Sequence, residues 1–266
     1  MSAGGRVALV TGAARGIGAA TVRALAADGW RVVAVDRSAD DPRLPYPLGT
    51  TEELHAVVRD ASDGQGTVVP VIADTCDPGA MVAAVGQAEQ RFGGLDAVVA
   101  AAGVVAGGVP LWEMPDAELR AVLEVDLTGP IVAARAAIPA LLRRPAPRQG
   151  RYLAVASAAA TRGMPGLAAY GAAKAGVAGL VRGLAADLAG TGITANAVSP
   201  GSTATPALDE SARLYGLASP EAFADQHTVG RLLEPGEVAA ALVWLAGVGT
   251  GGITGAVLPV DGGLAL

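Results

Sequence analysis

The sequence predicts an α/β fold in which a doubly wound parallel sheet of about seven strands carries helices on both faces. Short apolar runs alternate along the chain with longer stretches of helical spacing. These runs are apolar at nearly every position, which is typical of parallel strands buried on both faces. A glycine-rich turn follows the first run and opens the first helical stretch. We therefore expect a single Rossmann-like domain over residues 1–266.

The predicted strands are short runs rich in Val, Ile and Ala, a composition and length that favour strands over helices. They are Val7–Val10, Arg31–Val35, Thr67–Ile72, Ala97–Ala100, Tyr152–Ala156, Thr194–Val198 and Ala256–Val260. Consecutive parallel strands need a crossover, so helices are expected between them. The predicted helices are Ile17–Ala27, Thr51–Arg59, Gly79–Phe92, Ala117–Leu142, Ala169–Leu188 and Gly236–Leu245.

Composition excludes several classes of function. The net charge of −6 argues against a nucleic-acid partner or an anionic membrane surface. Residues Val238–Val260 carry no charge, but Gly247–Gly252 would break a spanning helix, so no membrane span is expected. The first twenty or so residues predict strand, turn and helix rather than a secretion signal. We expect a cytoplasmic protein with a small-molecule substrate.

The few cysteine and histidine residues limit metal and redox chemistry. Cys76 is the single cysteine, so no intrachain disulfide can form and a reducing compartment is expected. His55 and His227 cannot build a usual structural zinc site with one cysteine, and no metal is predicted. For His227 we expect a solvated or hydrogen-bonded structural role.

Two long stretches depart from the strand–helix alternation. Ser38–Gly66 contains the proline-spaced Asp41–Leu48, which is expected to be stiff and extended. Long ordered loops are often lids, so we expect this insertion to cover a cofactor, with an ordinary surface insertion as the alternative. Ser202–Gly230 lies between the sixth strand and the last helix and is predicted to be a lid over the substrate.

The glycine-rich turn Thr11–Gly18 predicts a dinucleotide site. Glycines let backbone amides approach a pyrophosphate, and the helix N-terminus adds partial positive charge. The spacing is Gly-x3-Gly-x-Gly rather than the commoner Gly-x-Gly-x2-Gly, so the turn by itself is weak evidence and its strand–helix context supports it. The candidate cofactor-binding residues here are Gly12, Arg15, Gly16, Ile17 and Gly18.

Carboxylates at strand ends predict which nucleotide binds. Asp36 ends the second strand, where it can accept hydrogen bonds from the adenosine ribose and repel a 2′-phosphate. Arg37 and Arg15 favour phosphate, but the position of Asp36 predicts NAD over NADP. Asp74 and Thr75 close the third strand, where Asp74 could accept from the adenine amino group or be a solvated loop residue.

Tyr170 and Lys174 predict an acid/base device. Residues at i and i+4 share one face of a helix. An ammonium near a phenol favours the phenolate and lowers its pKa toward working pH. Ser157, at the end of a strand, could hold an alcohol or carbonyl oxygen beside the phenol. A tyrosine and a lysine at this spacing are common, so the rest of the chain must support the hypothesis.

The order of these motifs along the whole chain resembles the short-chain dehydrogenase/reductases. The resemblance implies hydride transfer at a nicotinamide, with Tyr170 as the acid/base. It implies that Lys174 binds the nicotinamide ribose and lowers the tyrosine pKa, and that Ser157 orients the substrate. Thr203 and Thr205 would hold the nicotinamide carboxamide. Further matching residues are Pro200, Gly201, Thr254, Gly255, Asp261, Gly262 and Gly263.

The chain departs from this family twice. The usual Asn-Ala-Gly after the fourth strand is Ala101-Ala102-Gly103, and Gly103 is still expected to line the cofactor through its backbone. The asparagine that completes the family's catalytic tetrad falls at Asp126. An aspartate accepts the same hydrogen bond and, if ionised, would stabilise the charged Lys174. The alternative is a helix-kink residue without chemistry.

Finer details resemble the mycofactocin-coupled short-chain oxidoreductases, in Val35–Leu48, Ala154–Ala159, Arg182–Gly192 and Leu232–Pro235. That resemblance implies an NAD that stays bound and is re-oxidised by the peptide-derived carrier mycofactocin. The alternatives are an ordinary dehydrogenase or ketoreductase that exchanges NAD(H), and a non-catalytic NAD-binding scaffold. The helices Ala117–Leu142 and Ala169–Leu188 and the apolar Ala256–Leu266 favour a homotetramer. Residues expected near an apolar substrate mouth are Trp112, Met164, Leu167, Tyr215 and Phe223.

Overall fold

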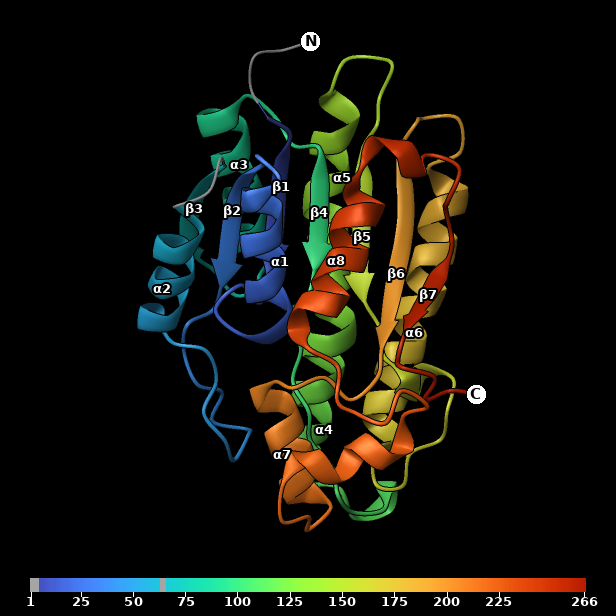
Figure 1. Ribbon diagram of the computed structural model, residues 1–266. Helices are drawn as coiled ribbons and strands as arrows, with labels where there is room; N and C mark the ends of the chain where they lie inside the picture. Colours follow the sequence, from blue (N-terminus) through green and yellow to red (C-terminus); the bar gives the residue numbers. More distant parts are fainter. Residues whose placement is uncertain (1–4, 63–65) are drawn as a thin grey trace.

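The computed structural model describes residues 5–62 and 66–266 and contains the predicted seven-stranded sheet (Figure 1). All neighbouring strands are parallel, in the order β3-β2-β1-β4-β5-β6-β7. The predicted bounds are correct to within about two residues, which is the usual uncertainty at element ends. The strands are β1 Val7–Thr11, β2 Arg31–Asp36, β3 Thr67–Ile72, β4 Ala97–Ala100, β5 Arg151–Val155, β6 Thr194–Pro200 and β7 Val257–Val260.

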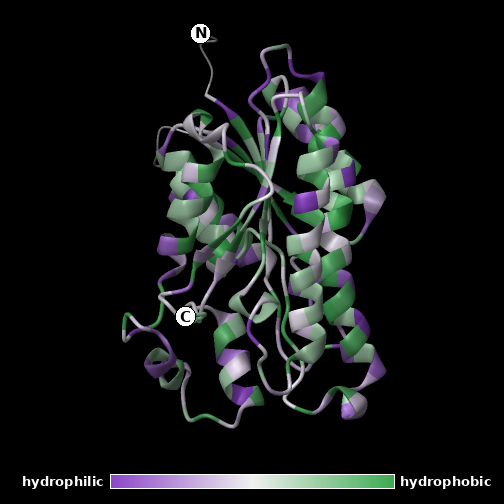
Figure 2. Ribbon diagram, turned by 90° about the vertical axis from the view of Figure 1, so that its right-hand side faces the viewer, coloured by the Kyte–Doolittle hydropathy of each residue, from purple (hydrophilic) through white to green (hydrophobic). Residues whose placement is uncertain are grey.

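Two layers of helices enclose the sheet, which Figure 2 shows from the side. Helices α1, α2 and α8 cover one face, and α3, α5 and α6 cover the other. Helix α7 was not predicted as a helix; it lies inside the predicted lid. The helices are α1 Gly16–Ala27, α2 Thr51–Ser62, α3 Pro78–Phe92, α4 Asp116–Leu123, α5 Gly129–Arg143, α6 Ala168–Asp187, α7 Pro206–Leu214 and α8 Pro235–Ala246.

Strand β1 explains why the strand candidates are continuously apolar. All of its residues are buried. Val7 and Leu9 pack into the core under α3, α5 and α6, whereas Ala8 and Val10 pack into the core under α1, α2 and α8. Successive side chains of a strand point to opposite faces, so both sets must be apolar when helices cover both faces.

Helices α3 and α8 both begin with capping residues. Asp77 caps α3 by accepting from the amides of Gly79 and Ala80 at 2.8 and 3.1 Å, with a proline in its first turn. Glu234 and Glu237 form a capping box at the start of α8. Such caps satisfy the amides that a helix N-terminus leaves without partners.

The predicted helix Ala117–Leu142 is interrupted. Helix α4 leads through a π-turn, η2 Glu124–Thr128, into α5. The continuous stretch Asp116–Arg143 is long and apolar enough to cross a membrane, but 61% of its most apolar window is buried inside the protein, as in the core helix of a soluble protein. The uncharged Val238–Val260 divides into the end of α8, a 3₁₀ turn and β7. Single π-turns inside α-helices are frequent at functional sites.

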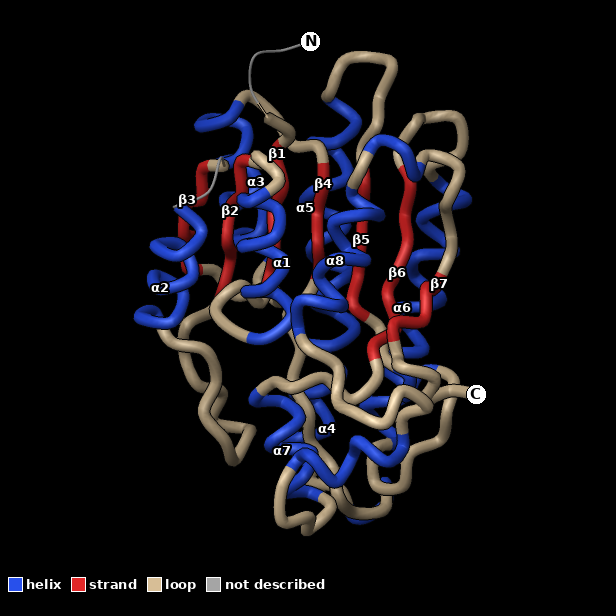
Figure 3. The backbone as a smooth tube through the Cα atoms, in the orientation of Figure 1, coloured by secondary structure: helices blue, strands red, loops and turns tan. Residues whose placement is uncertain are grey.

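The carboxyl ends of the strands meet at one edge of the molecule, where the connecting loops gather with α4 and α7 (Figure 3). The strand order reverses between β1 and β4, and ligands of such sheets bind in the crevice at that point. Of the insertion Ser38–Gly66, the stretch Ser38–Thr50 is a loop at this edge, α2 follows it, and residues 63–65 lie outside the described part. The expectation of an extended Asp41–Leu48 is wrong, because the chain turns at Pro42–Arg43, where the Leu44 amide donates to the Asp41 carbonyl at 2.9 Å. We call Ser38–Thr50 the strap.

Candidate active site

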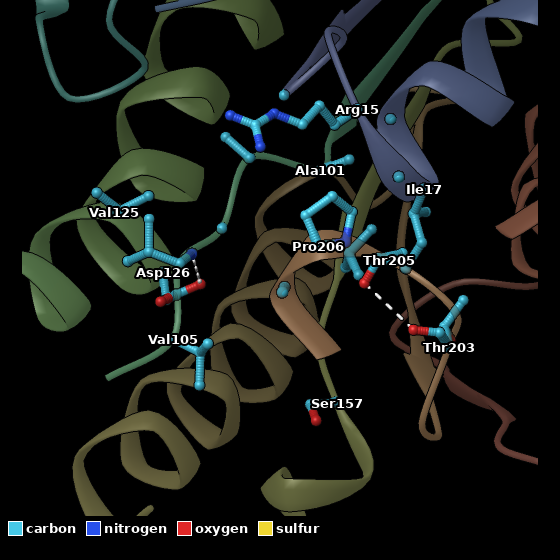
Figure 4. Close-up of a pocket in the computed structure, with 18 of the residues that line it drawn as sticks. Arg15, Ile17, Ala101, Val105, Val125, Asp126, Ser157, Thr203, Thr205 and Pro206 are labelled. Atoms are coloured by element: carbon cyan, nitrogen blue, oxygen red, sulfur yellow. Dashed lines mark hydrogen bonds between the residues drawn. The ribbon is translucent and has the colours of Figure 1, made fainter. Parts of the chain in front are cut away.

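A cavity of about 310 Å³ lies at the carboxyl edge of the sheet. The glycine turn after β1, the strap, the loops after β2 to β6 and the start of α7 line it. Figure 4 shows Asp126 on one side of this space and Ser157 at the end of β5, with Arg15, Ile17 and the Thr203–Thr205 loop opposite. The described part of the chain contains no cluster of three or more His, Cys, Asp or Glu residues able to hold a metal ion.

The glycine turn presents bare backbone to the cavity. Gly12 and Gly16 have φ of +67° and +53°, a conformation that favours glycine. A Cβ on Gly18 would lie 2.0 Å from the Gly12 carbonyl oxygen, and one on Gly12 would lie 2.7 Å from Ala102 Cα. Side chains cannot fit at these positions, so the N-terminus of α1 stays open to an anion. The turn therefore fits the pyrophosphate of a dinucleotide.

Asp36 lies at the opposite end of the cavity from the catalytic candidates, because β1 and β4 separate β2 from β5 in the sheet. Its carboxylate accepts from the amides of Ala14 at 3.0 Å and Ser38 at 2.8 Å, which fixes its orientation. A Cβ on Gly49 of the strap would lie 3.0 Å from Asp36 Oδ1. The strap therefore packs directly against the carboxylate that is predicted to hold the adenosine ribose.

The two arginines that favour a 2′-phosphate are already paired. The Arg37 guanidinium lies 3.1 Å from Asp41 and 3.6 Å from Asp74. Arg15 lies 3.2 Å from Glu53 and donates to the Pro47 carbonyl at 3.3 Å. Their charges are balanced by carboxylates, and the strap narrows the space beside Asp36. These contacts favour NAD. They also make Arg15 and Arg37 less able to bind the 2′-phosphate of NADP.

Tyr170 and Lys174 lie on one face of α6, as the i, i+4 spacing predicts. The Lys174 Nζ lies 5.6 Å from the centre of the Tyr170 ring and donates to the Val155 carbonyl at 3.2 Å. Ser157 follows β5 by two residues, and its Oγ accepts from the Ala159 amide at 3.2 Å, which fixes the hydroxyl at the start of a 3₁₀ turn. All three side chains line the cavity.

The pKa of Tyr170 is raised in this structure, contrary to the expectation from the sequence. Burial is the largest cause and disfavours the phenolate. Lys174 lowers this pKa as predicted, and Ser157 also lowers it, but Asp126 opposes them. For Lys174, the neighbouring Asp126 and Tyr170 outweigh burial and raise its pKa, so it remains an ammonium.

Asp126 lies on the π-turn and faces Lys174. Its Oδ1 is 2.9 Å from Lys174 Nζ and accepts from the Val104 amide at 3.3 Å, and its side chain is fully buried. A Cβ on Gly103 would lie 2.8 Å from Asp126 Oδ1, so this glycine leaves room for the ion pair. The other oxygen, Oδ2, is buried and has no hydrogen-bond partner in the described part of the chain. A helix kink alone would not require this pairing.

The loop after β6 forms the wall beside the glycine turn. Thr203 Oγ1 donates to the Gly201 carbonyl at 3.0 Å, and Thr205 Oγ1 donates to the Thr203 carbonyl at 3.2 Å (Figure 4). A Cβ on Gly16 would lie 3.0 Å from Thr205 Cγ2. At the third strand, Asp74 accepts from the Cys76 amide at 2.8 Å. One cavity is therefore lined both by the glycine turn and by the catalytic candidates.

Every catalytic and cofactor-binding residue predicted from the sequence lines this one cavity. Sequence reasoning selected no strap residue individually and missed Tyr46, whose hydroxyl accepts from the Val105 amide at 2.9 Å. The strap therefore extends past the adenosine end to the catalytic end, a position that the proline-spaced Pro45-Tyr46-Pro47 alone could not reveal. Other lining residues that were missed are Leu48, Gly49, Pro206, Ala207, Leu208, Ser211 and Leu264.

The prediction of residues near the substrate mouth is partly wrong. Met164 and Leu167 line the cavity. Trp112 does not, because it lies on the surface with 84% of its area exposed. Tyr215 donates to the Pro165 carbonyl at 2.7 Å and packs edge-on against the buried Phe223 behind the cavity wall.

Comparisons with known proteins agree with this architecture. A family model described as enoyl-(acyl carrier protein) reductase matches residues 12–265. The chain is 38% identical to cis-4-hydroxycyclohexanecarboxylate dehydrogenase of Sinomonas cyclohexanicum, over 97% of this chain and 96% of that one. It is 34% identical to (−)-trans-carveol dehydrogenase of Rhodococcus erythropolis, over 98% of both chains. The crystal structure of carveol dehydrogenase from Mycobacterium avium in complex with NAD superposes with a TM-score of 0.92, at 30% identity and over 98% of both chains.

Proposed function

Because this chain belongs to the short-chain dehydrogenase/reductase family and is an oxidoreductase acting on CH–OH groups, we propose that it interconverts an alcohol and its carbonyl with NAD. The observation that carries this proposal is the arrangement of the cavity. Tyr170, Lys174 and Ser157 meet at one end, and Asp36 lies at the other with the glycine turn between them. An extended dinucleotide bound along this path would place its nicotinamide beside Tyr170.

Each residue at the catalytic end has a separate role in the proposed reaction. When bound, NAD supplies the hydride acceptor and, in its oxidised form, a positive charge. The Tyr170 phenolate takes the proton from the substrate hydroxyl as the carbon–oxygen double bond forms. Ser157 holds the same oxygen in place. Lys174 remains an ammonium and favours the phenolate electrostatically, and Asp126 holds that ammonium in position.

Replacing the phenol tests this mechanism. Tyr170→Phe keeps the ring in place but removes the proton acceptor, so turnover should fall by about three orders of magnitude or more. NAD binding, measured by calorimetry, should change little. Turnover equal to that of the parent would rule out Tyr170 as the acid/base. Turnover that is absent from parent and variant alike, with NAD bound in both, would favour a redox-responsive scaffold.

For the substrate we propose an uncharged alicyclic alcohol. The catalytic end of the cavity is lined by the apolar Val105, Met164, Leu167, Leu208 and Leu264. Of the lining residues in the described chain, the cations are Arg15, Arg37 and Lys174, and each faces a carboxylate. A carboxylated ring would have no counter-ion, which is costly in an apolar pocket. The carveol-oxidising relative therefore suggests this substrate better than the hydroxycyclohexanecarboxylate dehydrogenase does.

A matched substrate pair tests this preference. Cyclohexanol and cis-4-hydroxycyclohexanecarboxylate share a ring and a reacting hydroxyl and differ in charge. We expect kcat/KM to be at least about tenfold higher for cyclohexanol or a methyl-substituted cyclohexanol than for the carboxylate. A preference for the carboxylate would contradict the assignment without affecting the proposed reaction.

We also propose that NAD stays bound between turnovers and is re-oxidised in place by mycofactocin. The strap supports this proposal because it packs against Asp36 at one end of the cavity and against Val105 at the other. A strap that spans the nucleotide must open before NAD can leave. Free exchange of NAD(H), as in an ordinary dehydrogenase, is the alternative.

One experiment distinguishes re-oxidation of bound NAD from free exchange of NAD(H). Purified protein is mixed with excess NAD and cyclohexanol, and NADH is followed by its absorbance. Retained cofactor predicts at most one reduction per protein, with turnover restored by an artificial electron acceptor. Sustained release of NADH into solution would overturn the proposal of retention. A mass spectrum of the purified protein under native conditions should show the bound nucleotide directly.

Finally, we propose that the chain assembles as a homotetramer. Helix α8 and the turn after it expose Trp244 and Val248 at 53% and 54% of their surface. Large apolar side chains that are this exposed favour burial between subunits. The neighbouring β7 is an edge strand of the sheet, which continues this face.

A further inference from the structure

His227 is a buried side chain that the proposed reaction does not use. It follows the 3₁₀ turn Pro220–Gln226 and has 5% of its surface exposed. Its ring does not line the cavity but lies directly behind the wall that Gly201 to Thr205 form. A buried imidazole with both nitrogens hydrogen-bonded is held in one orientation, and it can therefore fix the backbone groups that it contacts.

The two ring nitrogens have different partners. Nδ1 lies 2.6 Å from the Arg231 carbonyl, and Nε2 lies 3.0 Å from the Ser202 amide nitrogen. An amide N–H can only donate and a carbonyl can only accept. The hydrogen-bond network therefore assigns the ring hydrogen to Nδ1 and leaves Nε2 as the acceptor for Ser202. His227 is neutral in this arrangement.

This contact anchors the loop after β6. A Cβ on Gly201 would lie 2.8 Å from His227 Nε2 and 2.6 Å from the Asp261 carbonyl oxygen, so the loop packs closely against both. On its other side, Ser202 accepts from the Leu233 amide at 3.0 Å, and Leu233 accepts from the Ala204 amide at 2.8 Å. The Ser202 amide has its acceptor in the imidazole. Removing that acceptor would leave a partly buried donor without a partner, which favours a shifted loop.

We propose that His227 is a positioning residue for the nicotinamide end of the cofactor. It acts through the Ser202 amide, which fixes the loop carrying Thr203 and Thr205. This inference rests on the proposed NAD dependence, in which that loop holds the carboxamide. The adenosine end depends on the strap, Asp36 and the glycine turn, none of which contacts the imidazole. Loss of the contact should therefore weaken binding of the nicotinamide half alone.

Two amide substitutions separate the contacts of the ring. In His227→Gln, the side-chain oxygen can reach the position of Nε2 and accept from Ser202. In His227→Asn, the shorter amide can reach the position of Nδ1 and donate to the Arg231 carbonyl, but it leaves Ser202 without an acceptor. Both variants remove the ring, so they control for each other. Thermal melting shows whether both remain folded.

Calorimetric binding of NAD and of ADP-ribose, which lacks the nicotinamide, provides the readout. Protein stripped of nucleotide is titrated with each ligand. We expect His227→Asn to bind NAD about tenfold more weakly than the parent. Its affinity for ADP-ribose should stay within about twofold. His227→Gln should bind both ligands as the parent does. In single turnovers of the stripped protein with cyclohexanol, His227→Asn should need about tenfold more NAD than the parent for half-maximal NADH formation.

Several outcomes would overturn the proposal. It fails if His227→Asn binds NAD as tightly as the parent, or if NAD and ADP-ribose weaken equally. It also fails if His227→Gln is as impaired as His227→Asn. A parent protein that binds ADP-ribose but not NAD, or binds neither, would instead refute the proposed NAD dependence, so the two failures are distinguishable.

Discussion

The carboxylate of Asp126 changes the electrostatics of the catalytic residues, because it lies 2.9 Å from the Lys174 ammonium. An asparagine at this position, as the family resemblance implies, would leave Tyr170 facing a lysine with its full charge. Here the carboxylate offsets part of that charge and raises the pKa of Tyr170. Lys174 therefore stabilises the Tyr170 phenolate less than the Tyr170–Lys174 pair alone suggests.

Asp126→Asn should move the pH profile of alcohol oxidation to lower pH. Oxidation needs the Tyr170 phenolate, so its rate rises as pH passes through the Tyr170 pKa. Removing the carboxylate lowers that pKa, and the rising limb should shift down by about one pH unit. The measurement is the rate of NADH formation in a single turnover against pH. A profile that matches the parent would show that the charge at 126 has no catalytic role.

Asp126→Ala should behave differently, because it removes the hydrogen-bond acceptor as well as the charge. Lys174 is 4% exposed and would keep only the Val155 carbonyl as a partner. Breaking a buried ion pair on one side costs about 3–5 kcal/mol. Urea unfolding should therefore show a loss of this size in Asp126→Ala and a smaller one in Asp126→Asn. Equal losses in both variants would contradict this account of the pair.

At the scale of elements, the strap connects the two ends of the site. Arg43 pairs with the buried Asp41 at 2.8 Å, and its guanidinium also contacts Glu124, the first residue of the π-turn that carries Asp126. Tyr46 reaches Val105, whose neighbour Val104 donates to Asp126. Opening the strap would therefore break contacts with the same segments that hold the Asp126 carboxylate.

Arg43→Ala should speed the release of NAD by about tenfold, because it removes the ion pair with Glu124 that joins the strap to η2. Asp41 keeps Arg37 as a partner at 3.1 Å, so the strap itself should stay folded. The measurement is the fraction of NAD retained with time after gel filtration. Arg59→Ala, which removes an exposed ion pair to Glu52 on α2, is the matched control. Equal release from both variants would exclude a role for the strap contacts.

The glycine turn allows a second test at this scale. Gly18→Ala would place its Cβ 2.0 Å from the Gly12 carbonyl oxygen, so the turn must shift. We expect a loss of NAD binding and about 1–3 kcal/mol of stability. Gly86→Ala on α3 meets nothing within 4 Å and should stabilise the protein by about 0.5–1 kcal/mol. Calorimetry measures NAD binding, and urea unfolding measures stability. Intact NAD binding in Gly18→Ala would contradict the proposal that the glycine turn binds the pyrophosphate.

At the scale of the whole molecule, the two faces of the sheet are covered but the outer surface of α8 is not. Trp244 and Val248 leave 53% and 54% of their surface exposed, and burying that remaining area requires another subunit. The proposed cofactor retention and the proposed assembly therefore involve separate parts of the molecule: the strap lines the site within one chain, whereas the exposed Trp244 lies on α8.

Trp244→Glu should reduce the molar mass measured by light scattering, because a carboxylate would be buried at the proposed subunit contact. Trp112→Glu is the matched control, since Trp112 is 84% exposed on the η1 turn, Leu111–Glu113. It should leave the mass unchanged. A parent protein that is monomeric at micromolar concentration would refute the proposed tetramer directly.

The sequence by itself determined the fold and the identity of the candidate catalytic residues. Parallel strands are apolar throughout, glycine turns have fixed spacing, and Tyr170 and Lys174 share a helix face by periodicity, so each signal is local. The tertiary structure alone decided that Arg37 pairs with Asp41 and Asp74, that Tyr46 reaches Val105, and that burial and Asp126 raise the pKa of Tyr170. These outcomes depend on how segments distant in the chain pack, and on burial, which changes the balance of charges that no sequence pattern specifies.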